Sequence, residues 1–199
     1  MGTEQKDSQE SIRLFKNPAF EALTHIHPAT PFVIFMPVVF AFLFKGLQRH
    51  GVTLSFSLTL VGLLSWTLLE YILHRFVFHF TGSGKVLETV HFFIHGIHHD
   101  APKDATRLVM PLPVSVPLAF FFYFLFRNLF FPYHDPVFAG LVLGYLAYDF
   151  LHYAFHHLPL KGRVLTFLKQ YHLQHHYNDQ TKGFGVSNPL WDYIFRTTF

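Results

Sequence analysis

The residues of this sequence that could do chemistry are its histidines. The chain has 16 of them among 199 residues and no cysteine, so a metal site must use imidazole and carboxylate groups rather than thiolates. Two stretches hold matching clusters, HFFIHGIHHD at residues 91–100 and YHLQHHYND at residues 171–179. Neutral imidazole is a good ligand for zinc, copper and iron. We therefore predict that these histidines bind metal.

The spacing of the histidines is that of ligands on helices. Positions three and four apart lie on one face of an α-helix, so each H-x-x-H-H triplet is predicted to point one way. His74 and His79 are five apart and would diverge by about 140° on a straight helix, so they can converge only where the helix ends or bulges. One metal takes about four to six ligands, and ten histidines therefore suit two metals. The ten predicted ligands are His74, His79, His95, His98, His99, His152, His156, His172, His175 and His176.

Five neighbouring residues are weaker candidates for supporting the ligands, and no catalytic residue is predicted beyond the ligands themselves. His91 shares a helix face with His95. Asp149 precedes His152 by three positions and could accept a hydrogen bond from its imidazole. Glu70 is an acidic group in an apolar stretch, which marks it as a functional candidate. For two of the five, the histidines, a purely structural role is an open alternative. The candidates are His91, Asp149, Tyr148, Glu70 and His157.

The composition indicates a membrane protein. Hydrophobic residues make up 51% of the chain and charged residues only 14%, against about 25% in ordinary soluble domains. Four apolar stretches occupy residues 32–44, 52–73, 109–131 and 136–155, and the first is short and interrupted by proline. About 20 apolar residues in a helix cross a bilayer. We predict an all-α integral membrane protein with four transmembrane helices.

The basic residues predict the orientation of these helices. Four spans place residues 1–31, 74–108 and 156–199 on one side, together with 12 of the 15 Lys and Arg residues. Positive charge marks the cytoplasmic side, so both termini and a helical cap holding the histidines are expected there. A soluble helical bundle, the alternative, needs no such bias. The basic residues form no stripe of the kind that binds nucleic acid.

Two uses of a metal site at one membrane face stay open. Transport sites usually lie near the bilayer midplane, whereas these histidines collect at one face. A redox-active metal pair could instead activate dioxygen and attack a C–H bond of a lipid that reaches it from the membrane. The alternative from another class is a non-catalytic membrane protein that binds or transports metal.

The order of the histidine motifs resembles that of a known superfamily. H-x4-H, H-x2-H-H, H-x3-H and H-x2-H-H follow one another as in the fatty acid hydroxylase and sterol desaturase superfamily. The stretch HFFIHGIHHDAPKDATRLVMPLP at residues 91–113 is similar to the fatty acid 2-hydroxylase branch, and so is GFGVSNPLWDYIFRT near the C-terminus. The resemblance covers roughly residues 30 to 199.

The resemblance implies a four-helix membrane anchor with a cytoplasmic cap in which the ten histidines hold two metal ions. The implied reaction is the dioxygen-dependent 2-hydroxylation of long-chain fatty acyl groups, free or in ceramide-type sphingolipids. Iron is expected for activity because zinc has no redox chemistry, although zinc can occupy the same sites in a purified sample. A sterol or carotenoid oxygenase or desaturase is the alternative, and the R-L-V-M-P segment argues against it.

The N-terminal segment departs from many relatives, which carry a haem domain with a His-Pro-Gly-Gly signature. Here residues 27–30 read HPAT. We expect residues 1–30 to be a polar cytoplasmic segment and residues 31–199 to be the hydroxylase membrane domain. A form without the fused haem domain needs a separate electron donor, such as a b-type cytochrome or a ferredoxin with its reductase. It also favours a bacterial cytoplasmic membrane, or the endoplasmic reticulum membrane if the source is eukaryotic.

Overall fold

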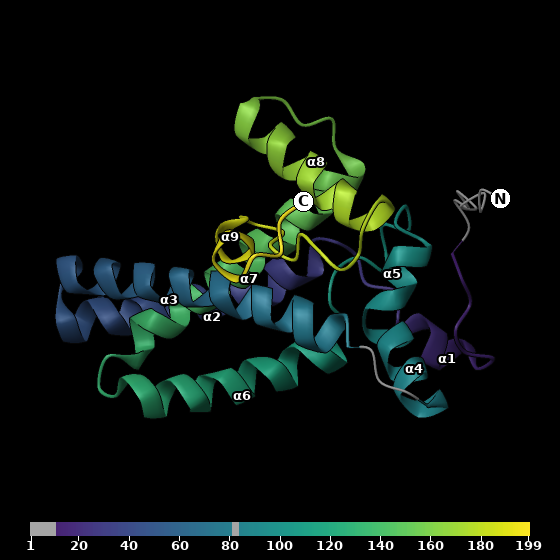
Figure 1. Cartoon of the computed structure of the whole chain (residues 1–199). Coiled ribbons are helices and arrows are strands. Elements are labelled where there is room, and N and C mark those ends of the chain that lie inside the picture. The colour runs from purple at the N-terminus through teal and green to yellow at the C-terminus, as the bar shows by residue number, and fades with distance from the viewer. Residues whose placement is uncertain (1–10, 81–83) are drawn as a thin grey trace.

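The fold is a bundle of long helices with a cluster of short helices at one end (Figure 1). The computed structural model describes residues 11–80 and 84–199, in which all regular structure is helical. The α-helices are α1 (Pro18–Ala22), α2 (Thr30–His50), α3 (Val52–Leu73), α4 (Lys85–His91), α5 (Ile97–Asp100), α6 (Leu112–Phe130), α7 (His134–His157), α8 (Arg163–Tyr177) and α9 (Leu190–Phe195). Two π-helices, η1 (His74–Phe78) and η2 (Phe92–Gly96), continue α3 and α4. The predicted all-α class is confirmed.

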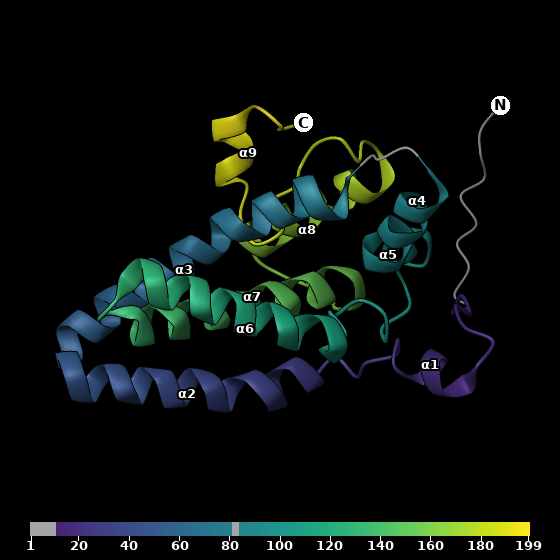
Figure 2. The same ribbon diagram turned by 90° about the horizontal axis from the view of Figure 1, so that it is seen from below.

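Four helices are long and apolar enough to cross a membrane: α2, α3 with η1, α6 and α7. The second has the bounds that the sequence predicts. The first is longer than predicted, because α2 continues beyond the apolar stretch, past residue 44, to His50. The third begins at Leu112 rather than at residue 109, because Pro111 has extended backbone angles. Figure 2 shows these four helices side by side, with α4 and α5 at one end.

Helix α7 is the centre of the bundle, and glycines let α3 approach it closely. A Cβ atom on Gly140 would lie 1.9 Å from the carbonyl oxygen of Thr59, and one on Gly62 would lie 1.9 Å from that of Val137. Small residues are typical of helix contacts in membranes, where close packing replaces the hydrophobic effect. In the most apolar 18-residue stretch of α7, 72% is buried, against 22% or less in the corresponding stretches of the other three spans. Those three helices therefore present their outer faces to lipid.

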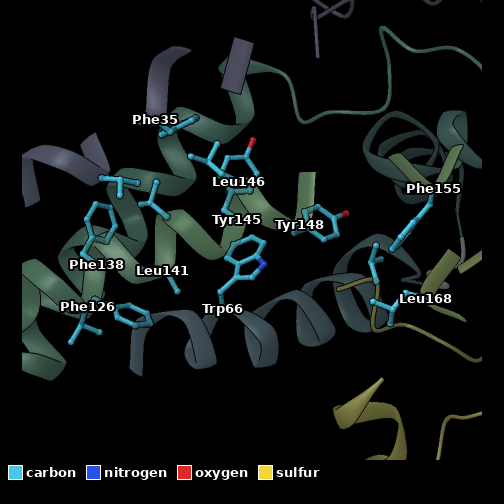
Figure 3. Packing of buried hydrophobic residues seen from close by; sticks show 14 residues of the cluster. Phe35, Trp66, Phe126, Phe138, Leu141, Tyr145, Leu146, Tyr148, Phe155 and Leu168 are labelled. Carbon is cyan, nitrogen blue, oxygen red and sulfur yellow. The ribbon is translucent and has the colours of Figure 1, made fainter. Parts of the chain in front are cut away.

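Aromatic side chains fill the space around α7 (Figure 3). The ring of Trp66 in α3 lies 5.5 Å from that of Tyr145 and 5.8 Å from that of Tyr148. Phe35 of α2 contacts Tyr145 edge-on from another side. The same cluster extends along α7 to its histidine-bearing end. The packed core of the bundle thus supports that end directly.

Candidate metal centre

All ten predicted ligands gather at one end of the bundle, in two groups of five. In each group, the five candidate ligand atoms lie within 4.8 Å of one another. The first group is His74, His79, His95, His99 and His175. The second group is His98, His152, His156, His172 and His176. All ten come from η1 and the residue after it, from η2 and α5, and from the C-terminal parts of α7 and α8. Distant segments of the chain must therefore fold before either group exists.

A π-helix brings together the two histidines that are five positions apart. In η1 the backbone N–H of His79 donates to the carbonyl oxygen of His74 at 3.1 Å, a hydrogen bond that spans five residues. The Nε2 atoms of His74 and His79 then lie 3.2 Å apart. The spacing required the helix to end or to bulge here, and the structure has the bulge. A second π-helix, η2, carries His95.

The two H-x-x-H-H triplets do not point one way, so that prediction is wrong. His95 and His99 belong to the first group and His98 to the second, because neighbouring positions on a helix differ by about 100°. In the other triplet, His175 lies in the first group, whereas His172 and His176 lie in the second. Each triplet therefore spans both groups and holds them side by side.

The distances between imidazole nitrogens suit shared metal ligation. In the first group, the Nε2 atoms of His79 and His175 are 2.9 Å apart and those of His95 and His99 are 3.0 Å apart. In the second group, His156 and His172 approach to 2.9 Å. Nitrogen ligands at about 2.1 Å from one ion, at right angles, are separated by roughly 3 Å. One ion in each group would satisfy these distances.

Backbone carbonyls orient two imidazoles of the first group. The Nδ1 atom of His74 donates to the carbonyl oxygen of Phe184 at 2.6 Å, and that of His175 donates to the carbonyl oxygen of Lys182 at 2.6 Å. A carbonyl oxygen only accepts, so the proton resides on Nδ1. The lone pair on Nε2 is then directed into the group, which is the arrangement typical of metal-binding histidines.

The second group contains buried nitrogens without a partner. Both ring nitrogens of His152 are buried and make no hydrogen bond within the described part of the chain. Buried polar atoms are normally paired, so an unpaired imidazole between four others points to a bound ion. Five imidazoles are also a donor set that iron and zinc accept. The residues present therefore fit a metal ion in each group.

Burial keeps these imidazoles neutral. It lowers the pKa of His79 to about 3 and that of His99 to about 2, and nearby histidines lower both further. Burial also lowers the pKa of His175 to about 4, although the carbonyl of Lys182 acts in the opposite direction. Only a neutral imidazole has a lone pair for a metal. The first group is thus ready to bind metal at neutral pH.

The weaker candidates lie around the groups rather than in them. The ring of His91 lies 6.3 Å from that of His79, and His157 stacks on Tyr153. The Tyr148 ring lies 5.5 Å from the His152 ring. Asp149 is buried, and among the described residues no hydrogen bond joins it to His152.

Glu70 binds the C-terminal segment (residues 184–199) rather than a ligand candidate. Its Oε1 atom accepts hydrogen bonds from the backbone N–H groups of Val186 and Ser187, both at 2.7 Å. Its Oε2 atom accepts from the hydroxyl of Ser187 at 2.5 Å. These bonds fix the chain two residues beyond Phe184, the residue that orients His74. Glu70 therefore acts on the first group through the backbone.

Sequence reasoning missed Asp192, a second anchor of this segment. Its carboxylate is fully buried and accepts hydrogen bonds from the backbone N–H of Phe184 at 2.9 Å and that of Gly185 at 2.8 Å. It also accepts one from the hydroxyl of Thr197 at 2.7 Å. The similarity of GFGVSNPLWDYIFRT to the hydroxylase branch was the one signal that could have pointed to it.

The R-L-V-M-P segment joins the N-terminal segment to the site. The buried guanidinium of Arg107 pairs with Glu21 and donates to the hydroxyl of Ser11 at 3.2 Å. Phe15 stacks on Phe93 of η2 with ring centroids 5.4 Å apart. The N-terminal segment thus packs against η2, which together with α5 carries three of the ligand candidates.

An apolar cavity lies between α2, α3, α6 and α7, below the histidine groups. It is partly open and has a volume of about 50 Å³. Its lining extends from Leu73, next to His74, and Met110 of the R-L-V-M-P segment to Phe138 in α7. This apolar lining suits a segment of an apolar chain.

A four-helix membrane bundle that ends in two five-histidine groups defines a class of membrane proteins with a histidine-rich site able to hold two metal ions. Within this class, the profile of the fatty acid hydroxylase family matches residues 59–197, and the chain belongs to that family.

Curated relatives and a solved structure share most of the chain. The fatty acid 2-hydroxylase of Mus musculus is 37% identical over 94% of this chain, which spans 56% of that relative's length. The dihydroceramide fatty acyl 2-hydroxylase of Arabidopsis thaliana is 38% identical, over 96% of this chain and 81% of its own length. A solved structure described as full-length scs7p, with only the hydroxylase domain visible, is 39% identical. The superposition has a TM-score of 0.87 and covers 94% of this chain and 71% of the chain in the solved structure.

Proposed function

We propose that the protein is an oxygen-dependent 2-hydroxylase of long-chain fatty acyl groups, free or in ceramide-type sphingolipids, with the ten histidines as ligands of two metal ions. The observation that carries the proposal is the position of the apolar cavity. Its lining begins at Leu73, the residue before the ligand candidate His74. A lipid chain in the cavity would therefore have one end beside the metals. The names of the mouse and Arabidopsis relatives agree with this reaction.

The cavity is deep enough for a segment of an acyl chain. In α7 its lining runs from Phe138 to Tyr145, seven residues or about 10 Å along the helix. We propose that the chain enters from the bilayer with its carboxyl end beside the histidine groups. Carbon 2 of the chain is then held near the two histidine groups.

Iron is the working metal that we propose, because insertion of oxygen into a C–H bond needs a redox-active ion and zinc has none of this chemistry. A bound iron pair would supply the activation of dioxygen. One oxygen atom enters the C–H bond and the other leaves as water, so each turnover takes two electrons and two protons. We propose that a separate carrier, such as a b-type cytochrome or a ferredoxin with its reductase, supplies the electrons.

We further infer that the histidine groups face the cytoplasm. Of the 14 Lys and Arg residues in the described part of the chain, 11 lie in segments on their side of the bundle, and the three others are Lys45, Arg49 and Arg127. Lys and Arg in short loops favour the cytoplasmic side. An electron donor in the cytoplasm would then have direct access to the metals.

The test is lipid mass spectrometry of cells that express the protein under labelled dioxygen. We expect 2-hydroxy acyl lipids whose new oxygen carries the label. His98→Ala and His175→Ala, one in each group, should abolish the product and lower the bound metal. His27→Ala is the matched control, because His27 is exposed and belongs to neither group. Product that survives both ligand variants would contradict the proposal, and modified sterols or carotenoids would assign the protein to the alternative reaction.

A further inference from the structure

Helix α9 lies against the outside of α3, away from the bundle core. Figures 1 and 2 show it beside α3 in two perpendicular views. The indole N–H of Trp191 donates to the hydroxyl of Thr67 at 2.9 Å. The ring of Phe195 stacks on that of Tyr71 with centroids 5.3 Å apart and an interplanar angle of 16°. One face of α9 is thus attached to a membrane-spanning helix at two successive turns.

The points of attachment lie at the depth of the bilayer. Thr67 follows Val52, the first residue of α3, by fifteen positions, and Tyr71 follows it by nineteen. At 1.5 Å per residue these residues lie about 22 and 28 Å along the helix. The hydrocarbon core of a membrane is about 30 Å thick. A helix held at these two positions lies near the surface of the leaflet on the histidine side.

The outer face of α9 is apolar and uncovered. The side chains of Tyr193 and Ile194 are 62% and 53% exposed, and those of Leu190 and Phe195 are about half exposed. Leu64 and Ile72 of α3, near the attachment points, are also exposed apolar side chains. Because α3 spans the membrane, lipid chains already cover that part of the surface.

The carboxylate of α9 and several of its backbone groups are directed inwards and paired, as burial in lipid requires. Asp192 is the only charged residue within the helix, and its carboxylate is fully buried with three hydrogen bonds. The backbone N–H of Tyr193 donates to the carbonyl of Pro189, and that of Thr197 to the carbonyl of Asp192. A helix exposed to water would not need to hide its one carboxylate.

We propose that α9 is embedded in the histidine-side leaflet, with Leu190, Tyr193, Ile194 and Phe195 in contact with lipid acyl chains. This inference does not depend on the reaction that the protein catalyses. It has a consequence for the site, because Asp192 joins the helix to Phe184, whose carbonyl orients His74. Lipid contact and the geometry of the first histidine group are thereby connected through one short segment.

The first test uses the two tryptophans of the chain, Trp66 and Trp191. The Trp66→Phe variant of the full chain, in vesicles of phosphatidylcholine brominated near the top of its acyl chains, reports on Trp191 alone. We expect its fluorescence to fall at least twofold relative to unbrominated vesicles, with little quenching by aqueous iodide. The matched Trp191→Phe variant reports on Trp66, which is buried inside the bundle, and should be quenched less by the brominated lipid.

The second test uses the absence of cysteine. Ile194→Cys should resist a membrane-impermeant maleimide in intact membranes and react after denaturation. Lys161→Cys, at an exposed position on the same side of the bundle, should react in both conditions. Rapid labelling of Ile194→Cys together with iodide quenching of Trp191 would mean that α9 faces water. No quenching by either agent would mean that a protein surface covers it, and either outcome would overturn the proposal.

Discussion

The Nδ1 atom of His74 lies 2.6 Å from the carbonyl oxygen of Phe184, 110 residues further along the chain. This hydrogen bond directs the lone pair of Nε2 towards the other histidines of the first group. The accepting carbonyl is held by Asp192 on one side and by Glu70 on the other. The C-terminal segment is therefore part of the site, although it supplies none of the ten ligand candidates.

Replacement of Asp192 should disturb the first histidine group and the fold together. Asp192→Ala removes a buried carboxylate and leaves three donors without an acceptor, which should cost about 3 kcal/mol or more of unfolding free energy. We expect a lower thermal unfolding temperature in detergent and less than two metal ions per chain by elemental analysis. Glu88→Ala, at an exposed position in α4, should change neither quantity. Full metal content in the Asp192 variant would contradict the anchoring role.

Substitutions of Glu70 should separate its shape from its charge. Glu70→Gln keeps an oxygen for the N–H groups of Val186 and Ser187, and its amide can donate to the Ser187 hydroxyl. We expect this variant to retain most of its metal and hydroxylation activity. Glu70→Ala loses all three bonds and should lose most of both. Both activity and metal content are measured for each variant. If the two variants are equal in both, the hydrogen bonds of Glu70 do not position the first histidine group.

Metal binding should tolerate mild acid. Protons compete for a ligand only below the pKa of the free imidazole, and burial lowers the pKa of His79 to about 3 and that of His175 to about 4. We therefore expect the bound metal to stay constant from pH 8 to about 5 and to be lost as the pH falls through about 4. Equilibrium dialysis followed by elemental analysis measures this. A midpoint near 6.5, the ordinary pKa of histidine, would show that the groups are open to water.

A larger side chain in the cavity should shorten the acyl chains that are hydroxylated. Ala119 lines the cavity seven residues from the start of α6, so Ala119→Phe places a ring about halfway down. We expect the ratio of long to short 2-hydroxy products to fall about tenfold, the scale of a pocket that discriminates by methylene groups. Ala41→Phe, on the exposed face of α2, is the matched control. An unchanged chain-length distribution in lipid mass spectrometry would place the acyl chain elsewhere.

The sequence alone determined which side chains can bind metal and where the four membrane-spanning helices lie. Without cysteine, and with ten histidines at helical ligand spacing, it predicted two imidazole sites, and both five-histidine groups are present. Hydropathy located α3 to the residue because no proline interrupts it. It underestimated the length of α2, since the helix continues beyond the apolar stretch to His50. Periodicity required the helix to end or to bulge between His74 and His79, because a straight helix cannot bring them together, and the structure has a π-helix there.

Only the tertiary structure decided which histidines share a group and what supports them. Local spacing sets His98 and His99 about 100° apart but cannot say which partners each meets. The partners of His98 come from α7 and α8, whereas those of His99 come from η1 and its C-terminal end, η2 and α8. The roles of Phe184 and Glu70 depend on contacts between residues more than a hundred positions apart. The role of Asp192 depends on hydrogen bonds from backbone N–H groups, which leave no pattern in side-chain type. The cavity and the attachment of α9 to α3 arise from packing between helices, and packing is a property of the folded chain.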